Sequence, residues 1–141
     1  MKTLQITIIG AGAIASIVFL VIITCVLETT PHTEMKITGF DNVYDVNQII
    51  RFQIHVEGYG NSCVGTPEIT IYETDQPSIV AYHEKSMSFM CPMEPQMLFF
   101  SGDYPSQNDY YLTAIDKEGK YTLHVSYRNT EIEKEFMVKA K

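Results

Sequence analysis

The sequence predicts an all-β domain, an antiparallel β-sandwich, that follows one transmembrane helix. Leu4 to Leu27 contains no charged residue and as a helix would reach about 36 Å, enough to cross a hydrocarbon core of about 30 Å. After it, short stretches of alternating apolar and polar residues are separated by turn residues at intervals of about 8–12 positions, the spacing typical of sandwiches.

We expect residues 1–28 to be an uncleaved anchor, residues 29–34 a short linker and residues 35–141 the sandwich. Lys2 precedes the apolar run and acidic residues follow it, which favours a cytoplasmic N-terminus and an extracytoplasmic domain. The run is longer than the roughly 7–15 apolar residues of a typical signal peptide, and no A-x-A-like site follows it. A single-pass cell-membrane protein is therefore expected.

The small residues of this segment have more than one interpretation. Gly10 to Ala15 matches the dinucleotide-binding pattern G-x-G-x-x-A, but the helix after it would be apolar all round and no α/β alternation follows. Gly12 and Ser16 lie four positions apart, so they could form a face on which another membrane helix packs, or simply be small residues tolerated by lipid. Cys25 resembles a lipidation site poorly because the apolar run continues beyond it.

The part of the chain after the anchor is acidic. It holds all 17 acidic residues and nine of the ten basic ones, a net charge of about −8. Because nucleic-acid affinity comes largely from clustered Lys and Arg on phosphates, we expect no nucleic-acid partner. Roughly 110 residues suffice for one domain with a single core.

Alternation is clearest in three stretches. In Ile49–Val56 and Tyr121–Tyr127 every second residue is apolar. In Glu131–Lys139 the inward parity includes Lys134, a charge that suits an edge strand protected from pairing with neighbours. The residues expected in the core are Ile50, Phe52, Ile54, Val56, Tyr121, Leu123, Val125, Tyr127, Ile132, Phe136 and Val138.

The remaining stretches give weaker signals. Gly58–Cys63 is expected to be a tight glycine-rich loop. Pro92–Ser106 is expected to be irregular, with a short strand at Met97–Phe100, since the prolines before it cannot sit in a central strand. Further strands are expected at Met35–Phe40, Glu68–Glu73, Ser78–His83 and Tyr110–Ile115.

Two of the three cysteines, Cys63 and Cys91, fall in the domain. In an oxidising compartment they are expected to form a disulfide, and closing a loop of about 29 residues would contribute about 3–4 kcal/mol. Cys25 is left over, either as a small apolar residue in lipid or as one half of a bridge to a second copy.

Tyr44 to Phe52 (YDVNQIIRF) resembles the opening of many bacterial and archaeal envelope immunoglobulin-like modules, and Gly119 to Val125 (GKYTLHV) resembles their penultimate strand. The whole chain is similar to short membrane-anchored proteins common in archaea. The resemblance implies an immunoglobulin-like antiparallel β-sandwich and a tyrosine corner, in which the Tyr121 hydroxyl bonds back to the preceding turn. It implies no activity, because this fold hosts many functions.

A Met-rich stretch provides the sharpest chemical hypothesis. Soft thioether ligands select Cu(I), and a copper-handling module would draw on His83, Met87, Met90, Met93 and Met97. The favoured interpretation is structural: these methionines fill gaps beneath a long loop, Cys91 is used by the disulfide, and no metal or other cofactor binds.

No other pattern indicates catalysis. His55 and His124 have outward parities on strands expected in different sheets, so a shared metal site is not expected, and no Ser or Cys nucleophile has a recognisable local signature. We therefore expect a non-catalytic binding or structural module of the cell envelope whose partner is another envelope or membrane protein. Phe99, Tyr104 and Tyr110 suit an interface as well as a core, whereas Phe100 and Tyr111 are expected in the core.

Overall fold

The structure is a computed structural model that describes residues 30–61, 63, 65–88, 91, 94, 96–106 and 109–140. The predicted membrane helix lies outside these residues. By its internal contacts the chain divides into residues 1–31 and residues 32–141, and the second unit holds all the described strands. In chain order they are β1 His32–Thr38, β2 Val43–Asp45, β3 Ile49–Asn61, β4 Glu68–Glu73, β5 Gln76–Glu84, β6 Met97–Tyr104, β7 Tyr111–Ala114, β8 Gly119–Tyr127 and β9 Thr130–Lys139.

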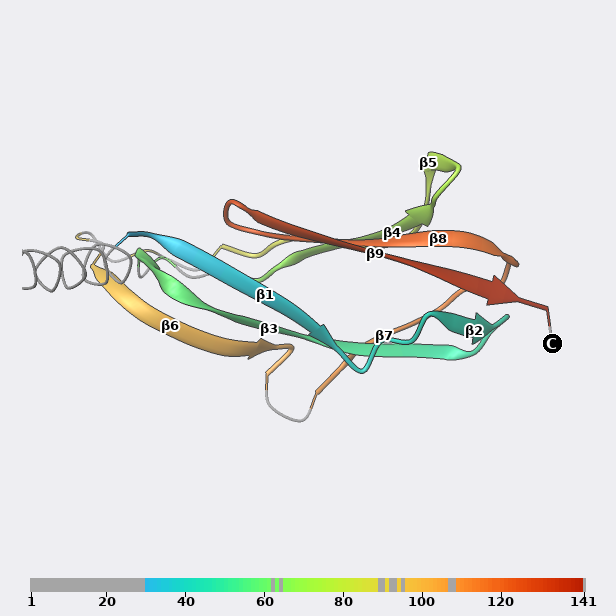
Figure 1. Ribbon diagram of the computed structural model, residues 1–141, viewed down its shortest axis with the longest axis horizontal. Coiled ribbons are helices and arrows are strands. Elements are labelled where there is room, and N and C mark those ends of the chain that lie inside the picture. Colours follow the sequence, from blue (N-terminus) through green and yellow to red (C-terminus); the bar gives the residue numbers. More distant parts are fainter. Residues whose placement is uncertain are drawn as a thin grey trace, which may run out of the picture. The chain divides into compact units, whose positions relative to one another are not determined.

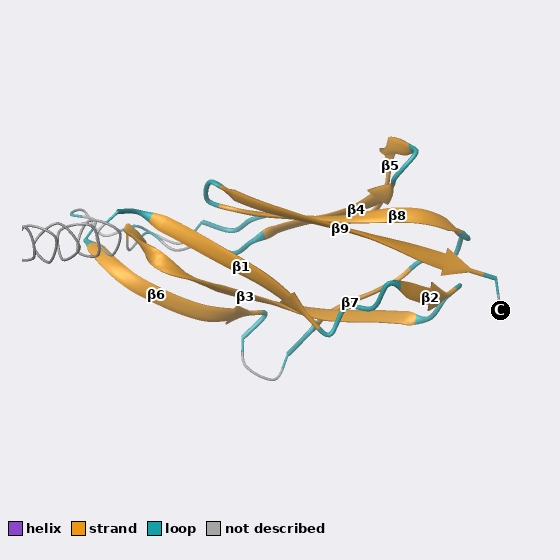
Figure 2. Ribbon diagram, in the orientation of Figure 1, coloured by secondary structure: helices purple, strands orange, loops and turns teal. Residues whose placement is uncertain are grey.

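The strands form two facing sheets (Figures 1 and 2). In the first sheet β3 lies between β1 and β6, and β7 pairs with the beginning of β3. The second sheet has the order β2-β9-β8-β4-β5, in which only the short β2–β9 pair is parallel. The prediction of an all-β sandwich is confirmed for the described residues.

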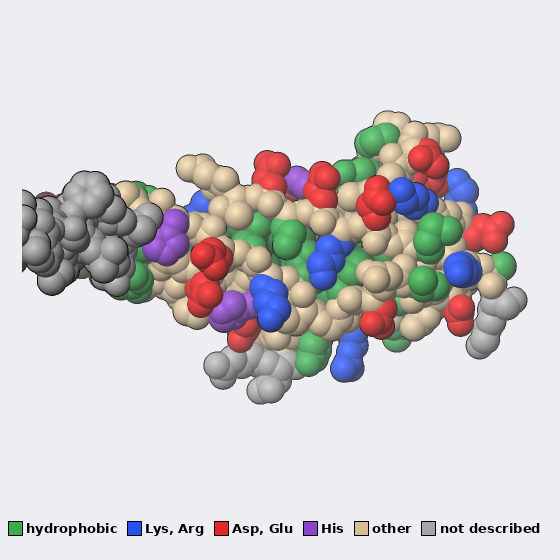
Figure 3. Space-filling model, viewed as in Figure 1, with side chains coloured by type: hydrophobic (Ala, Val, Ile, Leu, Met, Phe, Trp, Pro, Cys, Tyr) green, Lys and Arg blue, Asp and Glu red, His purple; other side chains and the backbone are tan. Residues whose placement is uncertain are grey.

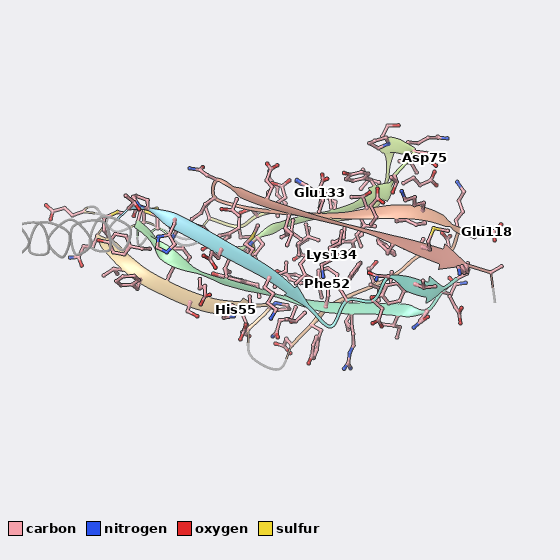
Figure 4. All side chains as sticks on the ribbon, viewed as in Figure 1. Phe52, His55, Asp75, Glu118, Glu133 and Lys134 are labelled. Atoms are coloured by element: carbon pink, nitrogen blue, oxygen red, sulfur yellow. A yellow bond between two sulfur atoms is a disulfide. The ribbon has the colours of Figure 1, made fainter. Side chains whose placement is uncertain are left out.

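The core lies between the inner faces of the two sheets, as the alternation predicts. On β3 the side chains of Ile50, Phe52, Ile54 and Val56 are at most 1% exposed, and Figure 4 shows Phe52 pointing into the space between the layers. Successive strand residues face opposite sides, so the same strand presents its polar side chains to solvent. The second sheet contributes Ile69, Ile71, Tyr121, Leu123, Val125, Tyr127, Phe136 and Val138 from β4, β8 and β9.

The tyrosine corner implied by the resemblance is confirmed. Tyr121 opens the buried row of β8, and its hydroxyl donates a hydrogen bond of 3.0 Å to the Lys117 carbonyl oxygen in the preceding turn. Burial of the ring raises the pKa of the Tyr121 hydroxyl, which stays a donor at neutral pH. The bond therefore ties the β7–β8 connection to the core.

Lys134 lies on the inward parity of β9 and is half-buried between the layers (Figure 4). In the described residues, β2 covers the outer edge of β9 only at Met137 to Lys139, which leaves the edge open beside Lys134. The expectation of an inward charge on an exposed strand edge agrees with this placement.

The glycine-rich stretch after Val56 is not the tight loop that we expected from the sequence. β3 continues to Asn61, and Gly58 and Gly60 occupy buried positions in its pleat. A Cβ atom on Gly58 would collide with the His32 carbonyl oxygen and lie 2.9 Å from Phe100 Cζ, while one on Gly60 would lie 2.6 Å from Arg128 Nη1. These glycines allow neighbouring backbone and side-chain atoms to approach the strand closely, which is a common role of glycine inside strands.

The two strands that pair with β3, namely β1 and β6, are also longer than predicted, because β3 extends to Asn61 and offers them more pairing positions. The extended end of β3 pairs with β1 from His32 onward, inside the stretch assigned to the linker. It also pairs with β6, which runs over Met97–Tyr104 rather than ending at Phe100. The two prolines that suggested an irregular segment, Pro92 and Pro95, both precede Met97.

We predict that Gly58→Ala destabilises the domain by at least about 2 kcal/mol, because the obstacle is backbone in the paired strand β1 and cannot move aside cheaply. Gly102→Ala is the matched control in the same sheet: its added Cβ would have Tyr104 Cε2 at 4.0 Å as its nearest neighbour. The control is expected to be neutral or up to about 1 kcal/mol more stable, since glycine weakens a strand. Urea unfolding of the two variants checks this, and equal midpoints would contradict it.

Candidate interaction surfaces

The described members of the predicted copper-ligand set come from two strands and one connection. His83 lies on β5, where its Nδ1 is 3.0 Å from Thr70 Oγ1 and its Nε2 is 3.8 Å from Glu68 Oε1. Met97 begins β6 in the other sheet, and Met87 is exposed in the β5–β6 connection. Met90 and Met93 lie outside the described residues, so the copper alternative stays a prediction.

Cys63 and Cys91 form the expected disulfide, with their Cα atoms 4.8 Å apart. The bridge joins the β3–β4 and β5–β6 connections. Arg128 reinforces this end: its guanidinium lies 4.2 Å from the Phe100 ring centre and donates hydrogen bonds of 2.7 Å to the Asn61 carbonyl oxygen and 3.3 Å to that of Cys63. We call the end of the sandwich at which β1 begins with His32 the proximal end, and the opposite end, at which β3 begins with Ile49, the distal end.

A charged cluster on the outer face of the first sheet has no counterpart in our predictions. His55 Nδ1 lies 2.7 Å from Asp103 Oδ1, and His55 Nε2 lies 3.7 Å from Glu57 Oε2. A carboxylate at Nδ1 also orients the histidine of hydrolytic triads, but here the second nitrogen faces another carboxylate instead of a hydroxyl. The pair joins residues 48 positions apart, so only the β3–β6 register could reveal it.

The hydrogen bond to Asp103 is the main reason that the pKa of His55 is raised above its ordinary value of 6.5. We predict that Asp103→Asn lowers this pKa, and that Glu57→Gln lowers it less because its oxygen is farther away. Since the folded-state pKa exceeds the unfolded one, the pair stabilises the fold fully below about pH 6.5 and loses this effect as the pH rises through the folded pKa. NMR titration of the His55 ring checks the order of the three proteins, and identical titrations would contradict it.

At the distal end, four side chains form what we call the distal surface: Ile49, Arg51, Tyr110 and Leu112. Arg51 and Leu112 are cross-strand partners on β3 and β7, and the Arg51 guanidinium lies 4.7 Å from the Tyr110 ring centre. Ile49 is 65% and Leu112 61% exposed. Tyr111, the residue between Tyr110 and Leu112, points to the other side of β7 instead, where its ring centre lies 5.4 Å from that of the buried Phe52.

A groove of about 460 Å³ borders the distal surface. Ile49 and Arg51 form one side, and the β1–β2 connection at residues 39–41 forms another. The Asp41 backbone N–H donates a 2.6 Å hydrogen bond to the Tyr44 hydroxyl, whose pKa is raised by burial. The groove is therefore lined by the exposed Ile49 side chain, by the charged Arg51 side chain and by a hydrogen-bonded stretch of backbone at Asp41.

The proximal surface comprises Tyr59, Met97 and Phe99, which lie on the outer face of the first sheet, while Leu98 between the last two has the opposite parity. Tyr59 and Phe99 are cross-strand partners whose ring centres lie 4.8 Å apart. Phe99 is 72% exposed, Leu98 48% and Met97 43%. A shallow groove of about 390 Å³ separates Phe99 from the first residues of β1. Phe99 thus lies at a surface, while Tyr104 is half-buried against Tyr127 at 5.9 Å.

The remaining polar groups are spread over both sheets. Figure 3 shows acidic and basic side chains interspersed on one face. His55 belongs to the first sheet and His124 to the second, as predicted. Across the part of the chain that the structure describes, no three His, Cys, Asp or Glu side chains are grouped so that they could hold a metal ion. That part also contains no helix long and apolar enough to span a membrane.

No family model and no curated protein matches the sequence. Among solved structures, a β-glucosidase from Listeria innocua, in complex with laminaribiose, aligns with a TM-score of 0.45 and 10% identity over 78% of this chain and 16% of its own length. The CARDB domain of a Pyrococcus furiosus protein, in complex with di-metal ions, gives 0.43 and 17% over 79% and 96%. A superoxide reductase (neelaredoxin) from Ignicoccus hospitalis gives 0.41 and 15% over 77% and 82%.

Proposed function

We propose that this chain is a single-pass membrane protein of the cell envelope whose immunoglobulin-like domain stands outside the cytoplasm and binds another envelope or membrane protein without catalysis. In this proposal residues 1–28 stay in the membrane as an anchor with a cytoplasmic N-terminus. The distal surface is the binding site. Each part has separate support.

The strand order supports the immunoglobulin-like assignment. In such domains strands A, B and E belong to one sheet, and strands C, F and G to the other, with C′ added beside C in the variable type. β1, β3 and β6 take the first three positions, β4, β8 and β9 the next three, and β5 that of C′. The Tyr121 corner at the start of β8 agrees with strand F.

The disulfide supports an extracytoplasmic location, because such bridges persist in oxidising compartments and are rare in the cytosol. The charge around the apolar segment supports the same orientation, with Lys2 before it and acidic residues after it.

The distal surface is the observation that carries the binding function. It combines a stacked Arg–Tyr pair with two exposed aliphatic side chains, and Tyr and Arg are enriched at the centres of protein interfaces. β3 runs from Ile49 at this surface toward Tyr59 at the proximal end, a span of about 33 Å. An N-terminal anchor would therefore hold the proximal end at the membrane and display the distal surface outward.

Site-specific photo-crosslinking in native membranes tests the proposal. A photoreactive amino acid in place of Leu112 is expected to give a discrete crosslinked product, and the same residue in place of Glu133, on the outer face of the other sheet (Figure 4), is the control. Adding Arg51→Glu should remove most of the product, because it reverses the charge at the centre of the surface. Equal crosslinking at the two positions, or no effect of Arg51→Glu, would contradict the assignment.

A further inference from the structure

The proximal surface is the most exposed aromatic feature of the described residues. The register aligns His32 on β1, Tyr59 on β3 and Phe99 on β6 in one row across the sheet. Phe99 and Met97, which share one face of β6, are respectively 72% and 43% exposed. This row crosses the first sheet at the end where β1 begins (Figure 1).

The chain itself limits how far this row can lie from the apolar segment. Only residues 28–31 separate Leu27, the last residue of the apolar run, from His32, the first residue of β1. The five steps from Leu27 to His32 span at most about 18 Å even when fully extended. The headgroup region of a leaflet is about 5–8 Å thick, so a segment embedded in lipid would place the row close to the headgroups.

We propose that the proximal surface rests in the interfacial region of the bilayer, with Phe99 and Met97 among the lipid headgroups and upper acyl chains. This inference rests on the proposed function, because it needs residues 4–27 to be embedded in the membrane. It adds a second attachment that fixes the tilt of the domain and directs the distal surface outward.

The chemistry of the row and of its neighbours fits this environment. Aromatic rings with a polar edge, such as that of Tyr59, concentrate at membrane interfaces. On the face of the sheet that carries this row, the nearest carboxylates along the strands are Glu34 and Glu57, which stand opposite each other about 7 Å from the aromatic row. Because an interfacial element buries its apolar side about 5–10 Å deep, these carboxylates can stay in water while the row is immersed.

The absence of tryptophan from the sequence provides a direct test. The full-length Phe99→Trp variant, reconstituted in phosphatidylcholine vesicles, carries one reporter that keeps an aromatic ring on Tyr59. Val43→Trp is the control, since Val43 is 49% exposed on β2 at the distal end. Lipids with bromine on shallow acyl carbons quench a tryptophan only when it lies at that depth.

We expect the fluorescence of Phe99→Trp to be blue-shifted and quenched at least about twofold by brominated lipid, and that of Val43→Trp to change by less than about a tenth. Emission of Phe99→Trp at the wavelength of exposed indole, with no quenching, would overturn the inference. Emission that is blue-shifted yet insensitive to brominated lipid would also overturn it, because a protein contact would then cover the surface.

Alkaline extraction of the same vesicles separates this failure from that of the proposed function. Extraction-resistant protein without quenching at Phe99→Trp rejects only the lipid contact. Protein released by alkali has no embedded anchor, and both the anchor and the lipid contact are then rejected.

Discussion

Phe136→Ala is expected to lower the free energy of unfolding by about 3–5 kcal/mol, the range found when a buried aromatic side chain is truncated in a core. Phe136 is 2% exposed. Its ring lies 5.1 Å from that of Phe40, 5.8 Å from Tyr44 and 5.7 Å from Tyr121. Truncation would leave a cavity between two rings of the second sheet and the Phe40 ring of the β1–β2 connection, which the backbone cannot close.

The adjacent residue supplies the control. Met137 is 40% exposed on the outer face of the same strand, so Met137→Ala is expected to cost less than about 1 kcal/mol. Urea unfolding of the full chain in detergent, followed by near-ultraviolet circular dichroism of the tyrosines, measures both variants. The total free energy of unfolding of a domain is of the order of 5–15 kcal/mol, so the loss expected for Phe136→Ala is a large and measurable part of it. If Phe136→Ala lowers the free energy of unfolding no more than Met137→Ala does, the described core is contradicted.

Replacing both cysteines of the bridge, Cys63→Ser with Cys91→Ser, is expected to cost about 3–4 kcal/mol. The bridged residues are 28 positions apart, and releasing a loop of this length restores that much conformational entropy to the unfolded chain. The bridge also fixes the segment whose Cys63 carbonyl oxygen accepts from Arg128, so the proximal loops should loosen with it.

Reduction of the unchanged protein is the matched test. With dithiothreitol present, its unfolding midpoint should fall to that of the double variant, while the double variant itself should not respond. Mass spectrometry under non-reducing conditions establishes the starting state. An unfolding midpoint that does not change on reduction would mean that the bridge adds nothing to stability.

The sequence was most informative where a pattern repeats along one strand. The period of two in β3 and β8 identified the buried rows that begin at Ile50 and Tyr121. Tyr121 could be assigned a specific bond because the corner involves residues only four positions apart. The cysteine pair needed no register at all, since only two cysteines lie in the domain.

Features that depend on the pairing of distant strands could not be predicted in the same way. Gly58 and Gly60 carry the same local signal whether they turn a chain or admit a close neighbour, and only the positions of β1, Phe100 and Arg128 decide between the two. The His55–Asp103 pair and the distal surface likewise arise from the partners that β3 finds in β6 and β7.

The central claim is that the first 28 residues remain in the membrane and hold the domain outside the cytoplasm. Protease added to intact cells, followed by alkaline extraction of the membranes, tests both parts of it at once. The account predicts that the sandwich is digested from outside while a fragment containing residues 4–27 stays in the alkali-resistant membranes. A full-length protein that is protected until the cells are opened, or that leaves the membranes in alkali, would contradict it.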